Sequence, residues 1–288
     1  MKFGSISYSL IFLFTEKQVM KRKEINSILA SIGMLLIIVL LSCTKKITTT
    51  AMSVTKNIVV AHRGAWKKNN LPENSIASLH EAIRQGCAGS EFDVHITIDD
   101  SLVINHDNAF GGMPIETTTY AELAATKLSN GEMLPTLRQY LLAGMHQQTT
   151  KLVLEIKPST TSKEHGIYAT EKIVALVQEL KAEPWIMYIS FDYDIVKKVK
   201  ALQPQANVAH LNGDKTPQEL KMDNITGADY NVGVYKKNPE WITEAKKAGI
   251  ELNAWTVNTK EDMQWLIDNK FDYITTNEPE LLFELIKK

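Results

Sequence analysis

The chain has 288 residues, of which 44% are hydrophobic and 23% are charged, and these values are typical of a globular protein. Its formal net charge of −1 excludes a basic field that would favour nucleic acid as a partner. Once an N-terminal segment is set aside, about 230 residues remain, which favours one large domain over two small ones. No feature of the sequence points to a particular oligomeric state.

The first 43 residues have the pattern of an export signal. A basic run at Lys21-Arg22-Lys23 is followed by an apolar run over residues 28–41, which is too short to span a bilayer comfortably. The run ends in Leu40-Leu41-Ser42-Cys43, which resembles the lipobox of bacterial lipoproteins, where the Cys is acylated and becomes the mature N-terminus. We therefore expect a lipoprotein signal peptide over 1–43 and a cell-envelope protein held to a membrane by lipid on Cys43. An uncleaved anchor helix is the alternative.

A polar stretch over residues 44–57 lacks apolar periodicity and is predicted to be a solvated tether. The folded domain is expected to span residues 58–288. If Cys43 carries lipid, Cys87 is the only other cysteine, so no intramolecular disulfide can form. Cys87 falls in an apolar helix-to-strand junction, and we expect it to be buried.

From residue 58 onward, predicted strands and helices alternate. Eight strands, each followed by a helix, favour an α/β fold of the (β/α)8 TIM barrel type, with an open doubly wound sheet as the alternative. Residues 107–134 break the alternation and predict a small insertion after the second strand, over one mouth of the barrel. The predicted strands are 58–61, 90–98, 151–156, 185–189, 207–211, 229–232, 251–254 and 272–275. The predicted helices are 75–85, 137–145, 168–180, 193–202, a weaker one around Gln218, 240–248, 260–269 and 280–286.

The second predicted strand carries two acidic residues and the third ends in another, and barrel enzymes carry their functional groups at strand ends. Glu91 and Asp93 are two apart on one strand and therefore share its inward face, while Phe92 faces the helices. Glu155 and Lys157 have the same spacing on the third strand. Three converging carboxylates repel one another unless they are neutralised, and a hard divalent cation such as Ca²⁺ or Mg²⁺ would do this. A structural network of salt bridges is the alternative.

Two histidines stand close to these acids in the predicted barrel. His62 and Arg63 end the first strand, and His106 closes the segment that follows the acidic second strand. Two imidazoles beside a metal-bound phosphate form a plausible acid and base pair near neutral pH. The other histidines are expected to be packed or on the surface, namely His80, His95, His146, His165 and His210.

Four motifs in this order resemble the signature of the glycerophosphodiester phosphodiesterase family, and the resemblance extends over about residues 59–279. The motifs are Ala61-His62-Arg63-Gly64-Ala65, Pro72-Glu73-Asn74-Ser75, Glu91-Phe92-Asp93-Val94 and Ile104-Asn105-His106-Asp107. Asn277 departs from the family pattern, which often has Asp there. The resemblance implies that Glu91, Asp93 and Glu155 bind the metal, that His62 and His106 are catalytic, that Arg63 and Lys157 hold the phosphate oxygens, and that Trp255 lines the pocket.

The resemblance implies metal-dependent hydrolysis of small glycerophosphodiesters to glycerol 3-phosphate and an alcohol. The attacking group would be either water or the neighbouring glycerol hydroxyl. Two alternatives remain open: a phospholipase-D-like or phosphoinositide-cleaving activity on membrane lipids, and a non-catalytic phosphodiester-binding lipoprotein. The mildly apolar sequence at 111–115 favours soluble substrates, and the presence of both histidines and all three acids favours an enzyme.

Overall fold

Eight parallel strands close into a barrel in the computed structural model, which describes Met20 and residues 57–287. Each strand pairs with its neighbours in the ring, and the first strand closes it by pairing with both the second and the last. The predicted (β/α)8 barrel is therefore confirmed. The strands are β1 (Val59–Ala61), β2 (Gly89–Ile96), β6 (Lys151–Ile156), β7 (Ile186–Ser190), β8 (Val208–His210), β9 (Gly227–Asn231), β10 (Glu251–Trp255) and β11 (Tyr273–Thr276).

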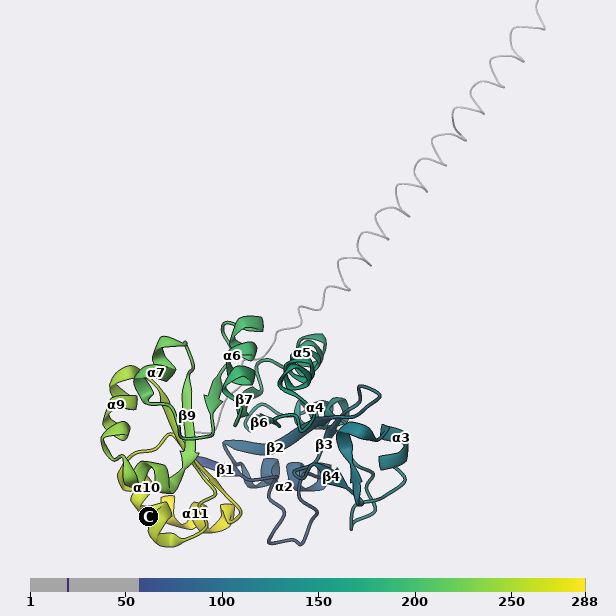
Figure 1. Ribbon diagram of the computed structural model, residues 1–288. Helices are drawn as coiled ribbons and strands as arrows, with labels where there is room; N and C mark the ends of the chain where they lie inside the picture. The colour runs from purple at the N-terminus through teal and green to yellow at the C-terminus, as the bar shows by residue number, and fades with distance from the viewer. Residues whose placement is uncertain (1–19, 21–56, 288) are drawn as a thin grey trace, which may run out of the picture. The chain divides into compact units, whose positions relative to one another are not determined.

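Helices cover the outside of the ring of strands (Figure 1). Most match the predicted positions, but α8 was not predicted, because Val232 was assigned to the preceding strand. Instead the strand ends at Asn231, whose side chain accepts a hydrogen bond from the Gly233 N–H and so begins the helix. The helices are α2 (Ile76–Gln85), α4 (Leu137–Gly144), α5 (Lys163–Glu179), α6 (Tyr193–Leu202), α7 (Pro217–Met222), α8 (Val232–Lys237), α9 (Glu240–Ala248), α10 (Lys260–Asp268) and α11 (Pro279–Ile286).

The main hydrophobic core lies between the strands and the helices. Outward-facing strand residues supply one side of it, as Phe92 shows by packing against Tyr140 of α4 with ring centroids 4.4 Å apart. A smaller apolar group built on Val60, Val153 and Ile189 fills part of the barrel interior. Because side chains alternate along a strand, the residues flanking Phe92 must point inward, as predicted for Glu91 and Asp93.

The second strand is longer than the first, and this difference shapes the mouth of the barrel. Gly89 and Ser90 pair with β1, whereas Val94 to Ile96 pair with the antiparallel strand β3 (Leu102–Ile104). Since β1 ends at Ala61, β3 pairs with the part of β2 beyond it. The chain therefore leaves both β1 and β3 beside β2, which brings His62 and His106 to the acidic strand from two separate segments.

The predicted insertion contains secondary structure of its own: β4 (Ala109–Phe110), β5 (Met113–Pro114), the 3₁₀ helix η1 (Ile115–Thr117) and α3 (Tyr120–Leu123). These elements pack on a separate cluster of buried residues made by Val103, Ile115, Leu123 and Leu134. The departure from regular βα alternation begins at β3, earlier than the predicted residue 107, because β3 pairs with the free part of β2.

Apart from Met20, the predicted signal peptide, including Cys43, lies outside the described residues, as do residues 44–56 of the predicted tether. Asn57, the last residue of the predicted tether, is hydrogen-bonded to the barrel domain, since its side chain donates to Gly86 O and accepts from the N–H groups of Val59 and Ala88.

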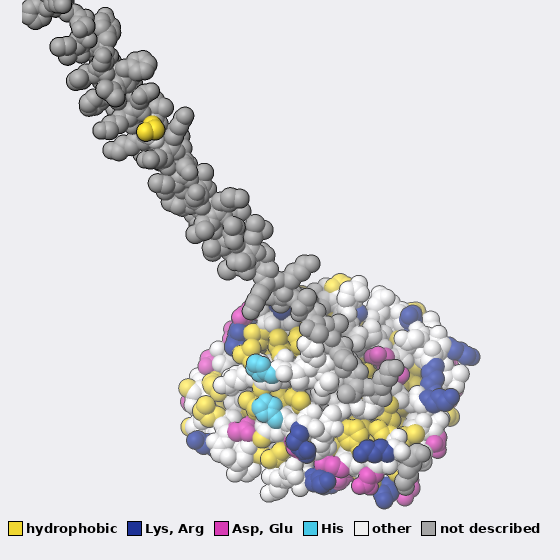
Figure 2. All heavy atoms as spheres, turned by 180° about the vertical axis from the view of Figure 1, so that it is seen from behind, with side chains coloured by type: hydrophobic (Ala, Val, Ile, Leu, Met, Phe, Trp, Pro, Cys, Tyr) yellow, Lys and Arg dark blue, Asp and Glu magenta, His cyan; other side chains and the backbone are white. Residues whose placement is uncertain are grey.

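Within the described part of the chain, no helix is both long and apolar enough to cross a membrane. On the face shown in Figure 2, basic and acidic side chains are interspersed. Cys87 is buried, as expected.

Candidate active site

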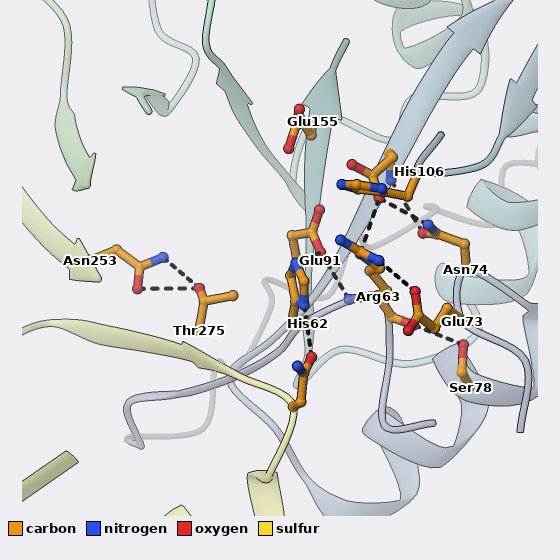
Figure 3. Close-up of polar contacts among 12 residues, drawn as sticks. His62, Arg63, Glu73, Asn74, Ser78, Glu91, His106, Glu155, Asn253 and Thr275 are labelled. Carbon is orange, nitrogen blue, oxygen red and sulfur yellow. Dashed lines mark hydrogen bonds and ion pairs between the residues drawn. The ribbon is translucent and has the colours of Figure 1, made fainter. Parts of the chain in front are cut away.

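The carboxyl ends of the barrel strands surround a small cavity of about 110 Å³. Six of the eight predicted site residues line it directly. Of the other two, Lys157 contacts the lining residue Glu155, and Asp93 contacts Lys157. Figure 3 shows His62, Arg63, Glu91, His106 and Glu155 converging from different segments. The complete lining is His62, Arg63, Glu91, His106, Glu155, Ile189, Phe191, Leu211, Asp229, Trp255, Thr256 and Thr275.

Three buried carboxylates lie together at one side of this cavity. One oxygen from each of Glu91, Asp93 and Glu155 lies within 4.8 Å of the others. Asp93 and Glu155 are register partners on the neighbouring strands β2 and β6, so the parallel pairing sets them side by side. Lys157 Nζ lies 3.2 Å from Asp93 Oδ1 and 2.8 Å from Glu155 Oε1, and it joins the two acids in one ion-pair network.

The cluster carries more negative charge than its surroundings balance. Burial and the neighbouring Asp93 raise the pKa of Glu91 well above its ordinary value, and the same two causes raise the pKa of Glu155 to about 7. Burial alone would raise the pKa of Asp93 too, but Lys157 and the hydrogen bond from Asn74 hold it below its usual range. Converging oxygen donors with an unmet demand for positive charge fit a hard divalent cation such as Ca²⁺ or Mg²⁺.

Asn74 fixes the orientation of Asp93. Its side-chain N–H donates to Asp93 Oδ2 at 2.9 Å, and its side-chain oxygen accepts from the Asp93 backbone N–H at 3.3 Å. Asn74 is buried and has a positive φ of 57°, a conformation that Asn tolerates better than most residues. Asn74 belongs to the motif Pro72-Glu73-Asn74-Ser75, but the sequence alone did not indicate its role.

A tight turn after β1 explains the His-Arg-Gly sequence. Arg63 has a φ of 55°, and its backbone N–H donates to Glu91 Oε2 at 2.8 Å. Gly64 follows with a φ of 79°, and a Cβ there would lie only 2.4 Å from Ser78 Oγ, so the position requires glycine. The Arg63 guanidinium is held by Glu73, with Nη1 2.6 Å from Oε2.

His62 is a largely buried imidazole with one fixed hydrogen bond. Its Nδ1 lies 2.8 Å from Asn277 Oδ1, and because an amide oxygen can only accept, Nδ1 carries the proton. Nε2 is 4.0 Å from Glu91 Oε2 and faces the acidic cluster. Burial and the Arg63 charge lower the pKa of His62 to about 4, so the ring is neutral at pH 7.

His106 lies closer to solvent, with 40% of its side chain exposed. Its Nδ1 is 2.8 Å from Asp107 Oδ1. Its backbone is tied to the acidic strand at two points: the neighbouring Asn105 N–H donates to Asp93 O, and His95 Nε2 lies 3.4 Å from His106 O. His95, which we expected to be a packed residue, is indeed buried, and it lies under the segment that carries His106.

The opposite side of the cavity is aromatic and apolar. Trp255 meets Phe191 edge to face, with ring centroids 5.3 Å apart, and Leu211 and Ile189 continue this wall. The Trp255 indole N–H donates to Asp229 O at 2.8 Å, which fixes the ring. The site therefore has an acidic and basic side suited to a phosphate group and an apolar side suited to carbon.

The cavity also contains a carboxyl group that sequence reasoning missed. The predicted strand 229–232 placed Asp229 at its first residue, far from the mouth, but β9 begins at Gly227 and carries Asp229 up to the cavity. The earlier start depends on a glycine, since a Cβ on Gly227 would lie 2.8 Å from that of Ala209. Gly227, two residues before Asp229 and next to the apolar Ala228, is the signal that could have extended this strand.

The comparisons with known proteins agree on one family. The sequence pattern of the "Glycerophosphoryl diester phosphodiesterase family" matches residues 62–281. A glycerophosphodiester phosphodiesterase of Caldanaerobacter subterraneus subsp. tengcongensis is 31% identical over 250 residues, covering 81% of this chain and 99% of its own length.

Solved structures give the same result. A glycerophosphodiester phosphodiesterase from Parabacteroides distasonis is 40% identical with a TM-score of 0.78, covering 81% of this chain and 98% of that one. An Oleispira antarctica phosphodiesterase, solved in complex with the product sn-glycerol 3-phosphate, shares the fold with a TM-score of 0.68 at 24% identity, over 81% of this chain and 97% of that one.

Proposed function

The chain belongs to the glycerophosphoryl diester phosphodiesterase family and is an enzyme of that class, and we propose that it cleaves small glycerophosphodiesters into glycerol 3-phosphate and an alcohol. The observation that carries this proposal is the convergence of three acids, two histidines and two cationic side chains around one cavity. The product complex of the Oleispira antarctica phosphodiesterase supports the identity of the phosphate product.

We assign one divalent cation, Ca²⁺ or Mg²⁺, to Glu91, Asp93 and Glu155. Such an ion supplies Lewis-acid polarisation of the phosphoryl oxygens when it is bound. The chain's own contribution at the phosphate is positive charge: Arg63 and Lys157 would hold the non-bridging oxygens and stabilise the negative charge that grows as the attacking oxygen approaches phosphorus. Both side chains are already fixed by acidic partners, so little reorganisation is needed.

The two histidines would move the protons. We assign the base role to His62, because its ring is neutral at pH 7 and its Nε2 faces the acidic cluster, while Asn277 holds the other nitrogen. His106 would then protonate the departing alkoxide, and its position at the exposed rim suits an alcohol that leaves toward solvent. The attacking oxygen comes either from water or from the neighbouring glycerol hydroxyl.

The insertion supports soluble substrates over intact membrane lipids. A lipid substrate needs an apolar entrance, but Phe110 and Met113 of the β4–β5 hairpin pack against the insertion's own buried cluster. Met133 is the exposed large apolar residue of this segment, and a single such side chain is ordinary on a protein surface. The non-catalytic alternative does not account for a complete set of three acids and two histidines at one cavity.

We further propose that the protein is an exported lipoprotein of the cell envelope, attached to a membrane through lipid on Cys43. The support is the sequence Leu40-Leu41-Ser42-Cys43 after an apolar run of signal-peptide length.

The activity is tested with purified full-length protein in detergent against glycerophosphocholine and glycerophosphoethanolamine. We expect glycerol 3-phosphate to be released, the release to stop in excess EDTA, and Ca²⁺ or Mg²⁺ to restore it. A Glu91→Gln variant should stay inactive after metal is added, and a His146→Ala variant serves as the unaffected control, because His146 lies outside the cavity lining. Full activity after exhaustive chelation would contradict the metal assignment.

A further inference from the structure

One side of the barrel interior has polar side chains that the proposed reaction does not use, and two of them, Asp229 and Thr275, line the cavity. Asp229 on β9, Asn253 on β10 and Thr275 on β11 come from three consecutive strands and face the barrel interior. Asn253 and Thr275 satisfy each other, because the Asn253 side-chain N–H donates to Thr275 Oγ1 at 2.9 Å. Figure 3 shows this pair set apart from Glu91 and Glu155.

Asp229 differs from its two neighbours because part of its carboxyl group has no partner. The residue is only 2% exposed, and its Oδ1 has no hydrogen-bond partner among the described residues. The two cations of the site are engaged elsewhere, Arg63 by Glu73 and Lys157 by the acidic cluster. A buried polar atom without a partner is unfavourable, so such an atom in a binding cavity points to a bound group that completes it.

The surroundings of Asp229 limit what that group can be. Leu211, Phe191 and Trp255 line the same part of the cavity, which therefore suits a carbon skeleton bearing hydroxyls. The whole cavity, including its acidic side, has a volume of only about 110 Å³, so the part beside Asp229 suits a small group such as a three-carbon polyol.

The charge state of Asp229 argues against a cationic head group. Burial raises its pKa to about 8, while the Asn253 side chain lowers it and the Glu155 charge raises it further, so the carboxyl favours its neutral form more than an exposed aspartate does and attracts an ammonium group less strongly. A neutral carboxyl both donates and accepts a hydrogen bond, as a hydroxyl does. Asp229 also lies outside the group of acids whose oxygens could share a metal ion among the described residues.

We propose that Asp229 is a specificity-determining residue that hydrogen-bonds a free hydroxyl of the substrate's glycerol moiety. This inference rests on the proposed function and deepens it, since it selects deacylated glycerophosphodiesters over diesters whose three-carbon unit has no free hydroxyl. Trp255 would support the contact, because its indole N–H donates to the backbone carbonyl oxygen of Asp229 and so fixes the position of that residue.

The test compares two diesters with the same phosphocholine group, glycerophosphocholine and propylphosphocholine, which lacks both hydroxyls. In the full-length enzyme, Asp229→Ala should lower kcat/KM roughly tenfold for glycerophosphocholine and leave propylphosphocholine nearly unchanged. Asp229→Asn should keep most of the wild-type preference, because a neutral amide also donates and accepts. Glu251→Ala is the matched control, since Glu251 faces the barrel interior on β10 away from this cavity.

Two results would overturn the inference. An equal loss for both diesters would show that Asp229 acts on the fold of the site, and a loss in Asp229→Asn as large as in Asp229→Ala would show that a charged carboxylate is needed. If the Ala variant does not fold by circular dichroism, Asp229→Val supplies the same test.

A binding measurement separates this inference from the proposed activity. By calorimetry with Mg²⁺ present, Asp229→Ala should weaken glycerol 3-phosphate binding roughly tenfold and leave propyl phosphate binding unchanged. If the wild type hydrolyses glycerophosphocholine alone, as attack by the glycerol hydroxyl would require, this measurement decides the role of Asp229. If the wild type hydrolyses neither diester, the proposed function fails, and this measurement still decides that role. Equal binding of glycerol 3-phosphate by the wild type and the Ala variant would refute that role.

Discussion

Removing the proposed cation should make the stability of the enzyme fall as the pH rises from 5 to 8. The reason is Glu155. In the folded protein without a cation, burial and the neighbouring Asp93 raise the pKa of this residue from 4.5 to about 7. The folded protein then binds this proton more tightly than the unfolded chain does, so raising the pH favours unfolding. The loss begins above the unfolded pKa of about 4.5 and is complete above about 7.

The size of the effect follows from the shift. The rise of the Glu155 pKa from 4.5 to about 7 corresponds to about 3 kcal/mol of unfolding free energy. Because Glu155 is buried, solvent does not screen its interaction with Asp93. Glu91 contributes in the same direction, because its pKa is raised as well. The lowered pKa of His62 opposes the trend below about pH 6.5, so the fall should be steepest between about pH 6.5 and 7. A cation at a hundred times its Kd would add back about 2.7 kcal/mol by mass action.

The assay is urea unfolding of EDTA-treated protein at a series of pH values, followed by circular dichroism. Glu155→Gln should flatten the pH dependence and, without metal, should be more stable than the wild type at pH 8. Glu244→Gln, at an exposed position on α9, should keep the wild-type dependence. The reasoning is refuted if metal-free stability rises between pH 5 and 8, or if Glu155→Gln leaves the slope unchanged.

Three further predictions concern catalysis and attachment. Replacing His62 or His106 by Ala should lower turnover by roughly 10²–10⁴-fold with the melting temperature nearly unchanged, and the double variant should be little worse; near-normal turnover in either single variant would contradict the assignment. Asn277→Asp places a carboxylate beside His62, which favours the imidazolium, so the acidic limb of the kcat/KM profile should move up by about one to two pH units; an unmoved limb would argue against His62 as the base. Cys43→Ser should abolish partitioning into membranes, and mass spectrometry showing no lipid on the wild-type Cys43 would disprove the anchor.

The barrel could be predicted because strands and helices alternate with clear periodicities over most of the domain. The acidic residues could be predicted equally well, since Glu91 and Asp93 share a strand face whatever the detailed packing. Strand ends were predicted less well, and the error at β9 hid Asp229, because one glycine allows the close approach to β8 that starts this strand early.

The partners of the site residues could not be predicted, because they come from distant segments. Asn277 and His62 are 215 residues apart in the chain and meet only because β11 pairs with β1. Asn74 reaches Asp93 through a left-handed backbone conformation that no periodicity reveals. The antiparallel strand β3 likewise depends on β1 being too short to cover β2.

The separate buried cluster of the insertion has a consequence for how this enzyme can change. Val103, Ile115, Leu123 and Leu134 stabilise the insertion independently of the core between strands and helices. Substitutions on the outer surface of α3 or the β4–β5 hairpin can therefore accumulate without loosening the strands that hold the acids. The insertion and the strands that hold the acids can thus evolve separately, and insertions exchanged between relatives should leave turnover on a shared substrate unchanged.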